Sequence, residues 1–186
     1  LIKKFSVQEI EKSFIHYYLV QNKLGNNAIL QSYFSGFQEN KSLVTILETQ
    51  NFEIDSLKIL ESYLELLIPI QDRKLNGAFF TPNYIVNFII KKIAPKKEDQ
   101  CLDPSCGSGA FLIGLVEYFK STFGKKVKET VKNNIFGSDI LPYNIERAKI
   151  LLSILALENN EYLEETDFNL YCQDSLKANW SKKYDI

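Results

Sequence analysis

The stretch "CLDPSCGSGAFLIG", residues 101–114, joins a short apolar run to an apolar helical pattern through a turn of small residues. Gly107 and Gly109 lack a β-carbon, so the backbone there can adopt positive φ angles and approach a ligand closely. A strand, a glycine turn and a helix in this order are typical of the first unit of a parallel sheet. The stretch therefore predicts an α/β fold with a ligand site at the turn.

The sequence on both sides of this turn continues the alternation of short apolar runs and helical patterns. We expect strands at 100–104, 134–139 and 169–174, the start of a fourth strand at 184–186, and helices at 82–93, 109–122 and 142–158. Thr81 is the expected N-cap of the first of these helices, and Pro82 its first residue. This order predicts a parallel sheet flanked by helices.

The sequence before residue 70 has helical periodicity only. Ser6 and Glu9 have the spacing of a capping box, which satisfies free amides at a helix start. A second helical stretch is expected over 27–50 with a break near Gly36, and a third from Asp55, as N-cap, to Ile68. The polar segment "QDRKLNG", residues 71–77, is typical of a linker. We therefore predict a helical domain over 1–74 and a second domain over 75–186.

The composition limits the classes of protein to which the chain can belong. The 186 residues are 45% hydrophobic and 24% charged, which is enough to bury a core, and the net charge is -1. The chain therefore lacks the overall basic charge typical of nucleic-acid binders. Its apolar runs are shorter than the roughly 20 residues of a membrane span, and no signal peptide opens it. We predict a cytoplasmic protein without a membrane partner.

The cysteines do not indicate a metal site. Cys101, Cys106 and Cys172 form no Cys-x-x-Cys pair, and the single histidine, His16, lies far along the chain. Cys106 has no basic partner in the sequence around it, so we predict a buried thiol rather than a nucleophile. The Lys-rich stretches 91–97 and 124–128 and the acidic stretch 158–167 are expected to be solvated.

Two common glycine motifs do not fit the turn. A dinucleotide fingerprint would place a third small residue where Leu112 stands, and a phosphate-binding loop would continue with Gly-Lys-Ser/Thr. Each predicted strand instead ends in an acid: Asp103, Asp139 and Asp174. Because the carboxyl ends of parallel strands share an edge, these carboxylates are expected to line it. They suit a ligand with an ammonium group, a ribose diol and an adenine amino group, as in S-adenosylmethionine, whose carboxylate can face the helix start.

Four segments together resemble a known family. In order and spacing, the first four motifs of N6-adenine DNA methyltransferases are similar to "GAFFTPNYIVNFI" (77–89), "LDPSCGSGAFLI" (102–113), "IFGSDILPYNIERAKILL" (135–152) and "NLYCQDSL" (169–176). The modification subunits of type I restriction systems and fused type II restriction-modification enzymes are the most similar members. The resemblance covers about residues 75–186. It implies an N-terminal helical region followed by the first part of a Rossmann-like, S-adenosylmethionine-dependent methyltransferase fold.

The resemblance also implies roles for single residues. The methionine end of the cofactor would be held near Thr81 and Pro82, its amino acid moiety by Asp103, Pro104, Gly107 and Gly109, its ribose by Asp139, and its adenine by Ile140 and Asp174. Leu141 stands where many relatives carry a second acid. The ribose hydroxyls are therefore assigned to Asp139 alone.

The family's chemistry is performed by an Asn/Asp-Pro-Pro-Tyr/Phe motif that follows the fourth strand and holds the flipped-out adenine. The 186 residues contain no such tetrapeptide, so we expect the chain to end just before it, predict no catalytic residue, and expect this fragment alone to be inactive. The implied partners are DNA, through regions outside this chain, and specificity and restriction subunits. Two alternatives remain: a non-catalytic Rossmann-like interaction module, and methylation of RNA or of protein glutamine.

Overall fold

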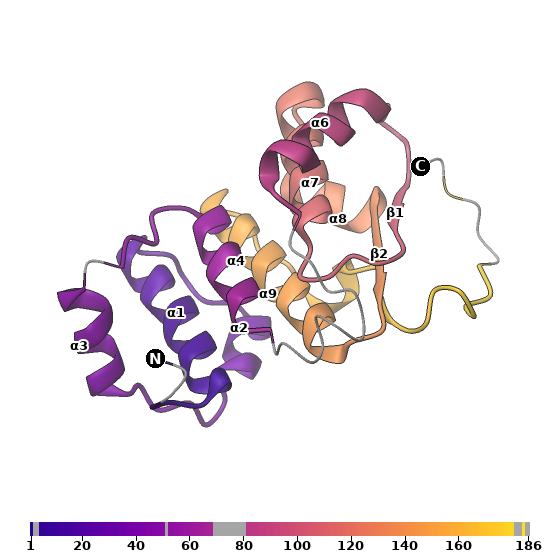
Figure 1. Ribbon diagram of the computed structural model, residues 1–186. Coiled ribbons are helices and arrows are strands. Elements are labelled where there is room, and N and C mark those ends of the chain that lie inside the picture. Colours follow the sequence, from indigo (N-terminus) through magenta and orange to yellow (C-terminus); the bar gives the residue numbers. More distant parts are fainter. Residues whose placement is uncertain (2–3, 51, 69–80, 181–183, 185–186) are drawn as a thin grey trace. The chain divides into compact units, whose positions relative to one another are not determined.

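The computed structural model describes residues 1, 4–50, 52–68, 81–180 and 184, and the chain divides into two compact units, Leu1–Phe80 and Thr81–Ile186 (Figure 1). The predicted domain boundary between residues 74 and 75 and the predicted linker at 71–77 lie outside the described residues. The predicted fourth strand at 184–186 also falls outside them, except for Tyr184.

The first unit contains helices α1 (Val7–Gln21), α2 (Ala28–Tyr33), α3 (Lys41–Thr49) and α4 (Leu57–Leu66). The capping box at the start of α1 is confirmed, because Ser6 Oγ accepts the Glu9 amide and Glu9 Oε2 accepts the Ser6 amide. The predicted break near Gly36 is also confirmed, as this glycine lies between α2 and α3 with a φ of 71°. The N-cap of α4 is Ser56 rather than Asp55, so that prediction was wrong by one residue.

Apolar side chains from α1, α3 and α4 form the core of the first unit. Those that are completely buried include Ile10, Ile15, Leu43, Leu47, Leu60 and Leu64. The rings of Phe14, Phe52 and Tyr63 pack beside them with centroids 5.5 to 5.8 Å apart. The apolar faces of these short helices are thus buried against one another.

The second unit contains every strand and helix predicted for it within the described residues. Its elements are α6 (Asn83–Ile93), β1 (Cys101–Asp103), α7 (Ala110–Phe123), α8 (Val127–Asn133), β2 (Ile135–Asp139), α9 (Pro142–Glu158), the 3-10 helix η1 (Glu165–Asp167) and β3 (Leu170–Cys172). Helix α8 was not predicted. The N-cap of α6 is Pro82, which can form no side-chain cap bond, so the prediction of Thr81 as N-cap was wrong.

The three strands form a parallel sheet in the order β1-β2-β3. Asp103 is paired with Gly137 and Asp139 with Cys172. Helices α7 and α9 connect successive strands and contact each other, and right-handed crossovers in the same direction place both on one face of the sheet. The predicted α/β architecture, a helical region followed by a parallel sheet with flanking helices, is confirmed.

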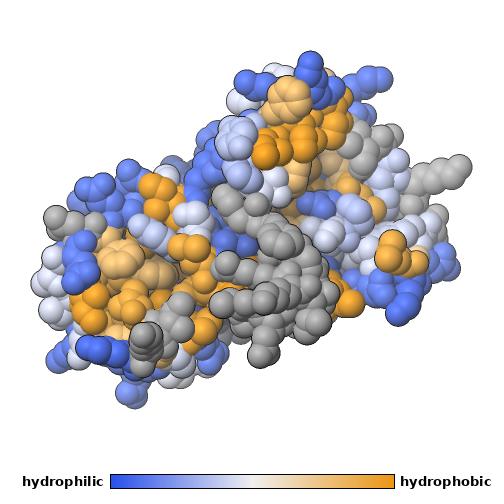
Figure 2. Space-filling model, in the orientation of Figure 1, coloured by the Kyte–Doolittle hydropathy of each residue, from blue (hydrophilic) through white to orange (hydrophobic). Residues whose placement is uncertain are grey.

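Glycines let the helices approach the sheet and each other closely. A Cβ on Gly137 of β2 would lie 3.1 Å from Leu112 Cδ1. The small residue that allows close packing of helix and strand is therefore on the strand, while the helix carries the large Leu112. A Cβ on Gly114 would lie 2.7 Å from Val86 Cγ1, which is too close, so the absence of a side chain at Gly114 lets α6 pack against α7. The outer side of α6 leaves Tyr84, Phe88 and Ile93 exposed, and Figure 2 shows hydrophobic surface over this helix.

Two stretches that we expected to be solvated are partly buried. Lys125 is 5% exposed and Asp167 is 2% exposed. Both lie in short connections that pack below the amino ends of the strands, where each finds partners of opposite charge. Within the described ranges, no helix has the length and apolar character needed to cross a membrane.

Candidate functional site

The glycine turn connects Asp103 at the end of β1 to the start of α7. Gly107 and Gly109 have φ angles of 53° and 99°, as predicted for this turn. A Cβ on Gly107 would meet no described atom within 4 Å, whereas one on Gly109 would lie 3.3 Å from the Ala148 Cβ of α9. Gly107 therefore borders open space that a ligand can enter. Gly109 is required by the packing of α7 against α9.

Asp139, the last residue of β2, lies under this turn and is 7% exposed. Its Oδ2 accepts the Gly107 amide at 3.0 Å, and its Oδ1 accepts the Leu141 amide at 2.8 Å and Asn144 Nδ2 at 3.1 Å. A carboxylate has about four acceptor positions, so about one remains open. One ribose hydroxyl can donate to this open position directly. Binding of two ribose hydroxyls requires the hydrogen bond from the Gly107 amide to Asp139 to break.

Asp103 lies on the same face of the sheet edge, since its partner Gly137 stands two residues before Asp139. Its Oδ1 accepts the Ser105 amide at 3.0 Å. Burial raises the pKa of Asp103, the Ser105 amide opposes this, and the neighbouring charge of Asp139 raises it further. In the part of the chain that the structure describes, no lysine or arginine forms an ion pair with either acid. Two adjacent carboxylates without a cation favour a positively charged ligand.

Cys106 lies inside the turn, and its amide donates to the Ser138 carbonyl at 2.9 Å. The side chain is 5% exposed, as predicted for a buried thiol. Burial raises the pKa of this thiol strongly, and the charges of Asp103 and Asp139 raise it further. The thiolate is therefore disfavoured, and Cys106 is unsuited to nucleophilic chemistry.

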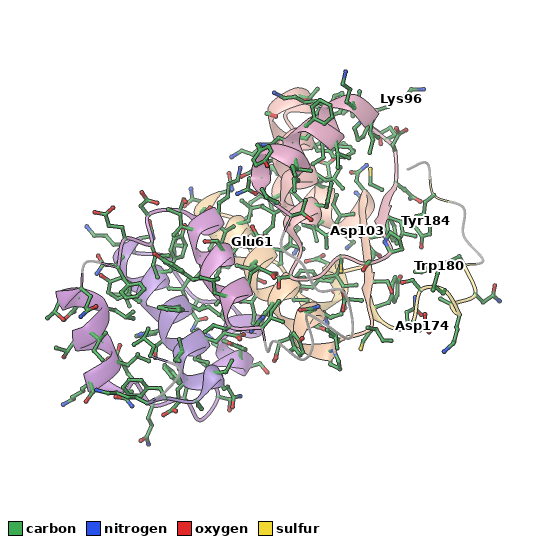
Figure 3. All side chains as sticks on the ribbon, in the orientation of Figure 1. Glu61, Lys96, Asp103, Asp174, Trp180 and Tyr184 are labelled. Carbon is green, nitrogen blue, oxygen red and sulfur yellow. The ribbon has the colours of Figure 1, made fainter. Side chains whose placement is uncertain are left out.

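Asp174 lies beyond the carboxyl end of β3 rather than on the strand itself. Asp174 lies two residues beyond β3, where it accepts the Leu176 amide at 3.0 Å and pairs with Lys177 Nζ at 3.1 Å. The hydrogen bond from Lys177 and then that from Leu176 lower the pKa of Asp174. Figure 3 shows Asp103 beside the sheet and Asp174 on the segment that leaves it. Among the described residues, no hydrogen bond joins Asp174 to Asp103 or Asp139.

The remaining predicted site residues are placed at the same edge or at the start of α6. Ile140 follows Asp139 and is 54% exposed, which leaves apolar surface for a ligand to cover. The Pro104 carbonyl accepts a hydrogen bond from Ser175 Oγ. Thr81 and Pro82 are partly exposed, and no hydrogen bond of the described chain links them to Asp103 or Asp139. Their contacts with a cofactor remain predictions.

Two residues of this edge were not identified from the sequence. Asn144 is 2% exposed on the first turn of α9, and its amide orients the Asp139 carboxylate. An amide side chain in the first turn of the predicted helix, five residues after Asp139, was the available signal. Ser175 bonds to Pro104, 71 residues earlier, and no local pattern indicates such a contact. The described residues include no group of three or more potential metal ligands.

Comparisons with known proteins identify the family of the chain. The family model described as N-6 DNA Methylase matches residues 59–186, more than half of the chain. The methylase subunit of the type I restriction enzyme MjaVII from Methanocaldococcus jannaschii is 28% identical over 139 residues, which are 74% of this chain and 22% of that protein. The methylase subunit of the type I restriction enzyme EcoEI from Escherichia coli is 30% identical over 77 residues, 40% of this chain and 16% of that protein.

A solved structure is also similar: the modification subunit of a candidate type I restriction enzyme from Vibrio vulnificus YJ016. It is 22% identical with a TM-score of 0.46, over 86% of this chain and 35% of that chain. The chain spans less than a quarter of either curated relative. Because the family model matches more than half of the sequence, the chain belongs to the N-6 DNA methylase family.

Proposed function

We propose that this chain is the S-adenosylmethionine-binding part of a DNA adenine-N6 methyltransferase from a cytoplasmic restriction-modification system. The observation that carries the proposal is the pair of neighbouring carboxylates, Asp103 and Asp139, beside the open space at Gly107. The two curated relatives are methylase subunits of type I restriction enzymes. DNA, a specificity subunit and a restriction subunit are therefore the proposed partners of the whole protein.

The residues of this edge fit the proposed cofactor. S-adenosylmethionine supplies an activated methyl group. It also carries two positive charges, on its ammonium and sulfonium groups, which can pair with the two carboxylates. Asp103 would accept the ammonium group, which favours its ionised form and reverses the effect of burial on its pKa. Asp139 would accept a ribose hydroxyl at its remaining acceptor position, and the start of α7 would face the cofactor's carboxylate.

The other proposed contacts involve smaller changes. Ile140 would cover one face of the adenine with its exposed side chain. Asp174 would exchange its bond with Lys177 for one with the adenine amino group. That exchange costs little, because the Lys177 side chain is 85% exposed and exposed ion pairs contribute little stability. Thr81 and Pro82 would contact the methionine end from the start of α6.

Titration calorimetry with S-adenosylmethionine and with NADH tests this function. We expect micromolar-range binding of S-adenosylmethionine, weakened at least tenfold in Asp139→Ala, because hydrogen bonds to a charged group contribute about 1.5–3 kcal/mol. Glu146→Ala is the matched control, since Glu146 is an exposed acid on α9 and its loss changes the net charge equally. Tight binding of NADH without binding of S-adenosylmethionine would contradict the proposal.

A second candidate is a non-catalytic interaction module that retains the turn only for packing. The observation in its favour is that Asp103, Asp139 and Asp174 already accept hydrogen bonds from the protein. Unchanged cofactor affinity in both Asp139→Ala and Asp174→Ala would support this candidate. A loss in Asp139→Ala but not in Glu146→Ala would exclude it.

A further inference from the structure

The hydroxyl of Ser175 connects the segments that follow β1 and β3 with β2 itself. Ser175 stands directly after Asp174, beyond β3. Its Oγ donates to the carbonyl of Pro104 in the glycine turn and is hydrogen-bonded at 3.0 Å to Ser138 Oγ in β2. A carbonyl can only accept, so the one proton of Ser175 is committed to Pro104. Ser138 is completely buried. The contact with Ser138 is therefore partly buried, while the bond to Pro104 lies at the surface.

The segment after Gln173 folds back on itself. Lys177 N and Ala178 N donate to the Asp174 carbonyl at 3.0 and 2.9 Å, and Trp180 Nε1 donates to the Ser175 carbonyl at 3.0 Å. We name residues 174–180 the acidic turn. Figure 3 shows Asp174 and Trp180 on this segment, beyond the sheet.

The backbone is held to the sheet only up to the residue before the acidic turn. Gln173 N donates to the Asp139 carbonyl at 2.9 Å, which fixes the chain as it leaves β3. In the described part of the acidic turn, Ser175 supplies the hydrogen bonds that reach the sheet and the glycine turn. The position of the acidic turn against the glycine turn therefore depends on the Ser175 hydroxyl, while ring contacts of Tyr184 with Trp180 and with Phe136 of β2 hold the far end of the acidic turn.

We infer that Ser175 is a positioning residue, whose hydroxyl fixes the acidic turn against the glycine turn and thereby sets the position of the Asp174 carboxylate. This inference rests on the proposed function, in which Asp174 accepts the adenine amino group. Removal of the hydroxyl leaves the Pro104 carbonyl and Ser138 Oγ without this partner and frees the acidic turn to shift. The adenine contact is then weakened although Asp174 itself is unchanged.

A double-mutant cycle tests the role, with S-adenosylmethionine affinity measured by calorimetry for wild type, Ser175→Ala, Asp174→Ala and the double variant. We expect Ser175→Ala to weaken binding about three- to tenfold, the effect of one hydrogen bond. The double variant should bind as Asp174→Ala does, because Ser175 acts through Asp174. Ser175→Thr keeps the hydroxyl and should restore most of the affinity.

Ser121→Ala is the matched control, since Ser121 Oγ donates to a backbone carbonyl within α7, away from the sheet edge. Its affinity should equal that of wild type. Losses that add in the double variant, or full affinity in Ser175→Ala, would overturn the positioning role while the proposed function stands. An absence of S-adenosylmethionine binding by the wild-type chain would overturn the proposed function, and this role with it.

Discussion

At the amino edge of the sheet, Lys125 bonds to Asn134 Oδ1 at 3.1 Å and lies 3.5 and 3.7 Å from the carboxylates of Glu98 and Glu129. At the carboxyl edge, Asp103 and Asp139 are neighbours, and no lysine or arginine among the described residues forms an ion pair with them. Asp167, also at the amino edge, lies 3.1 and 3.6 Å from the ammonium groups of Lys128 and Lys132. The two edges of the same three strands thus hold buried charge in opposite ways.

The pKa directions at the two edges express the same difference. Burial raises the pKa of Asp167, but the Glu164 amide, Lys128 and Lys132 outweigh it, so the net shift is downward. For Asp103 burial and the Asp139 charge prevail, and the pKa is raised. Partners compensate the desolvation of a buried charge, while a buried charge without them costs stability and is typical of a binding or catalytic site. The comparison therefore separates an acid that is paired within the chain from the acids that we propose to bind the cofactor.

The largest effect is expected from Asn134→Ala at the amino edge. Asn134 is 1% exposed, accepts from Lys125 and donates to the carbonyls of Lys97 and Asp99. Its loss should lower the free energy of unfolding by about 3 kcal/mol, because each bond contributes about 1 kcal/mol and the partners stay buried. Urea unfolding followed by emission of Trp180, the single tryptophan, measures this in the second unit.

The neighbouring exposed residue Asn133 gives the control, and Asn133→Ala should unfold as wild type does. Cofactor affinity of folded Asn134→Ala should be unchanged. A selective loss of affinity with normal stability would show that the amino edge is not purely structural, and would remove the contrast between the edges.

A smaller effect, opposite in sign, is expected from Asp103→Asn at the carboxyl edge. Asparagine keeps an acceptor for the Ser105 amide but removes the negative charge beside Asp139. The free energy of unfolding near pH 7 should rise by up to about 1 kcal/mol, while cofactor affinity falls about tenfold through loss of the ammonium partner. Calorimetry and urea unfolding measure the two quantities on the same sample.

Asp99→Asn is the matched variant at the other end of β1, where Asp99 Oδ2 accepts the Lys96 amide at 2.8 Å. It makes the same charge change and should leave cofactor affinity unchanged. Equal losses of affinity in the two variants would indicate a general effect of charge rather than a contact made by Asp103.

The elements around the glycine turn were predictable because their signals are local. Strand and helix patterns and the capping box at Ser6 depend on residues within a few positions of one another. Helix α8 was missed because its seven residues carry only Val127 and Val131 as apolar positions among charged and polar ones. The N-caps of α4 and α6 were each misplaced by one residue, which is the ordinary precision of helix ends.

At the site, the general rule for parallel strands placed Asp103 and Asp139 correctly, because each is the last residue of its strand. The strand predicted to end at Asp174 ends at Cys172, so Asp174 lies two residues beyond β3, where Lys177, three residues later, binds it. The roles of Asn144 and Ser175 depend on how α9 and the acidic turn pack against the sheet edge. That packing is decided by tertiary contacts and not by sequence spacing.

The smallest effect is expected from a change of pH, which distinguishes Asp103 from Asp167 most directly. The raised pKa of Asp103, from the usual 3.8, means that the free protein holds a proton there at a higher pH than the unfolded chain does. A cation needs the ionised form, so affinity is complete above this pKa, falls as the pH decreases through it, and is halved where the pH equals it. Ionisation of Asp103 opposes folding, so the stability of the folded protein increases as Asp103 is protonated. The stability therefore rises over the same pH range in which the affinity falls. Asp167, whose pKa is lowered, gives up stability only below 3.8.

Wild-type affinity should therefore decline while Trp180 emission still reports a folded second unit, and the decline should be absent from Asp103→Asn. Wild-type affinity that follows the same pH dependence as that of Asp103→Asn would show that no cation pairs with Asp103.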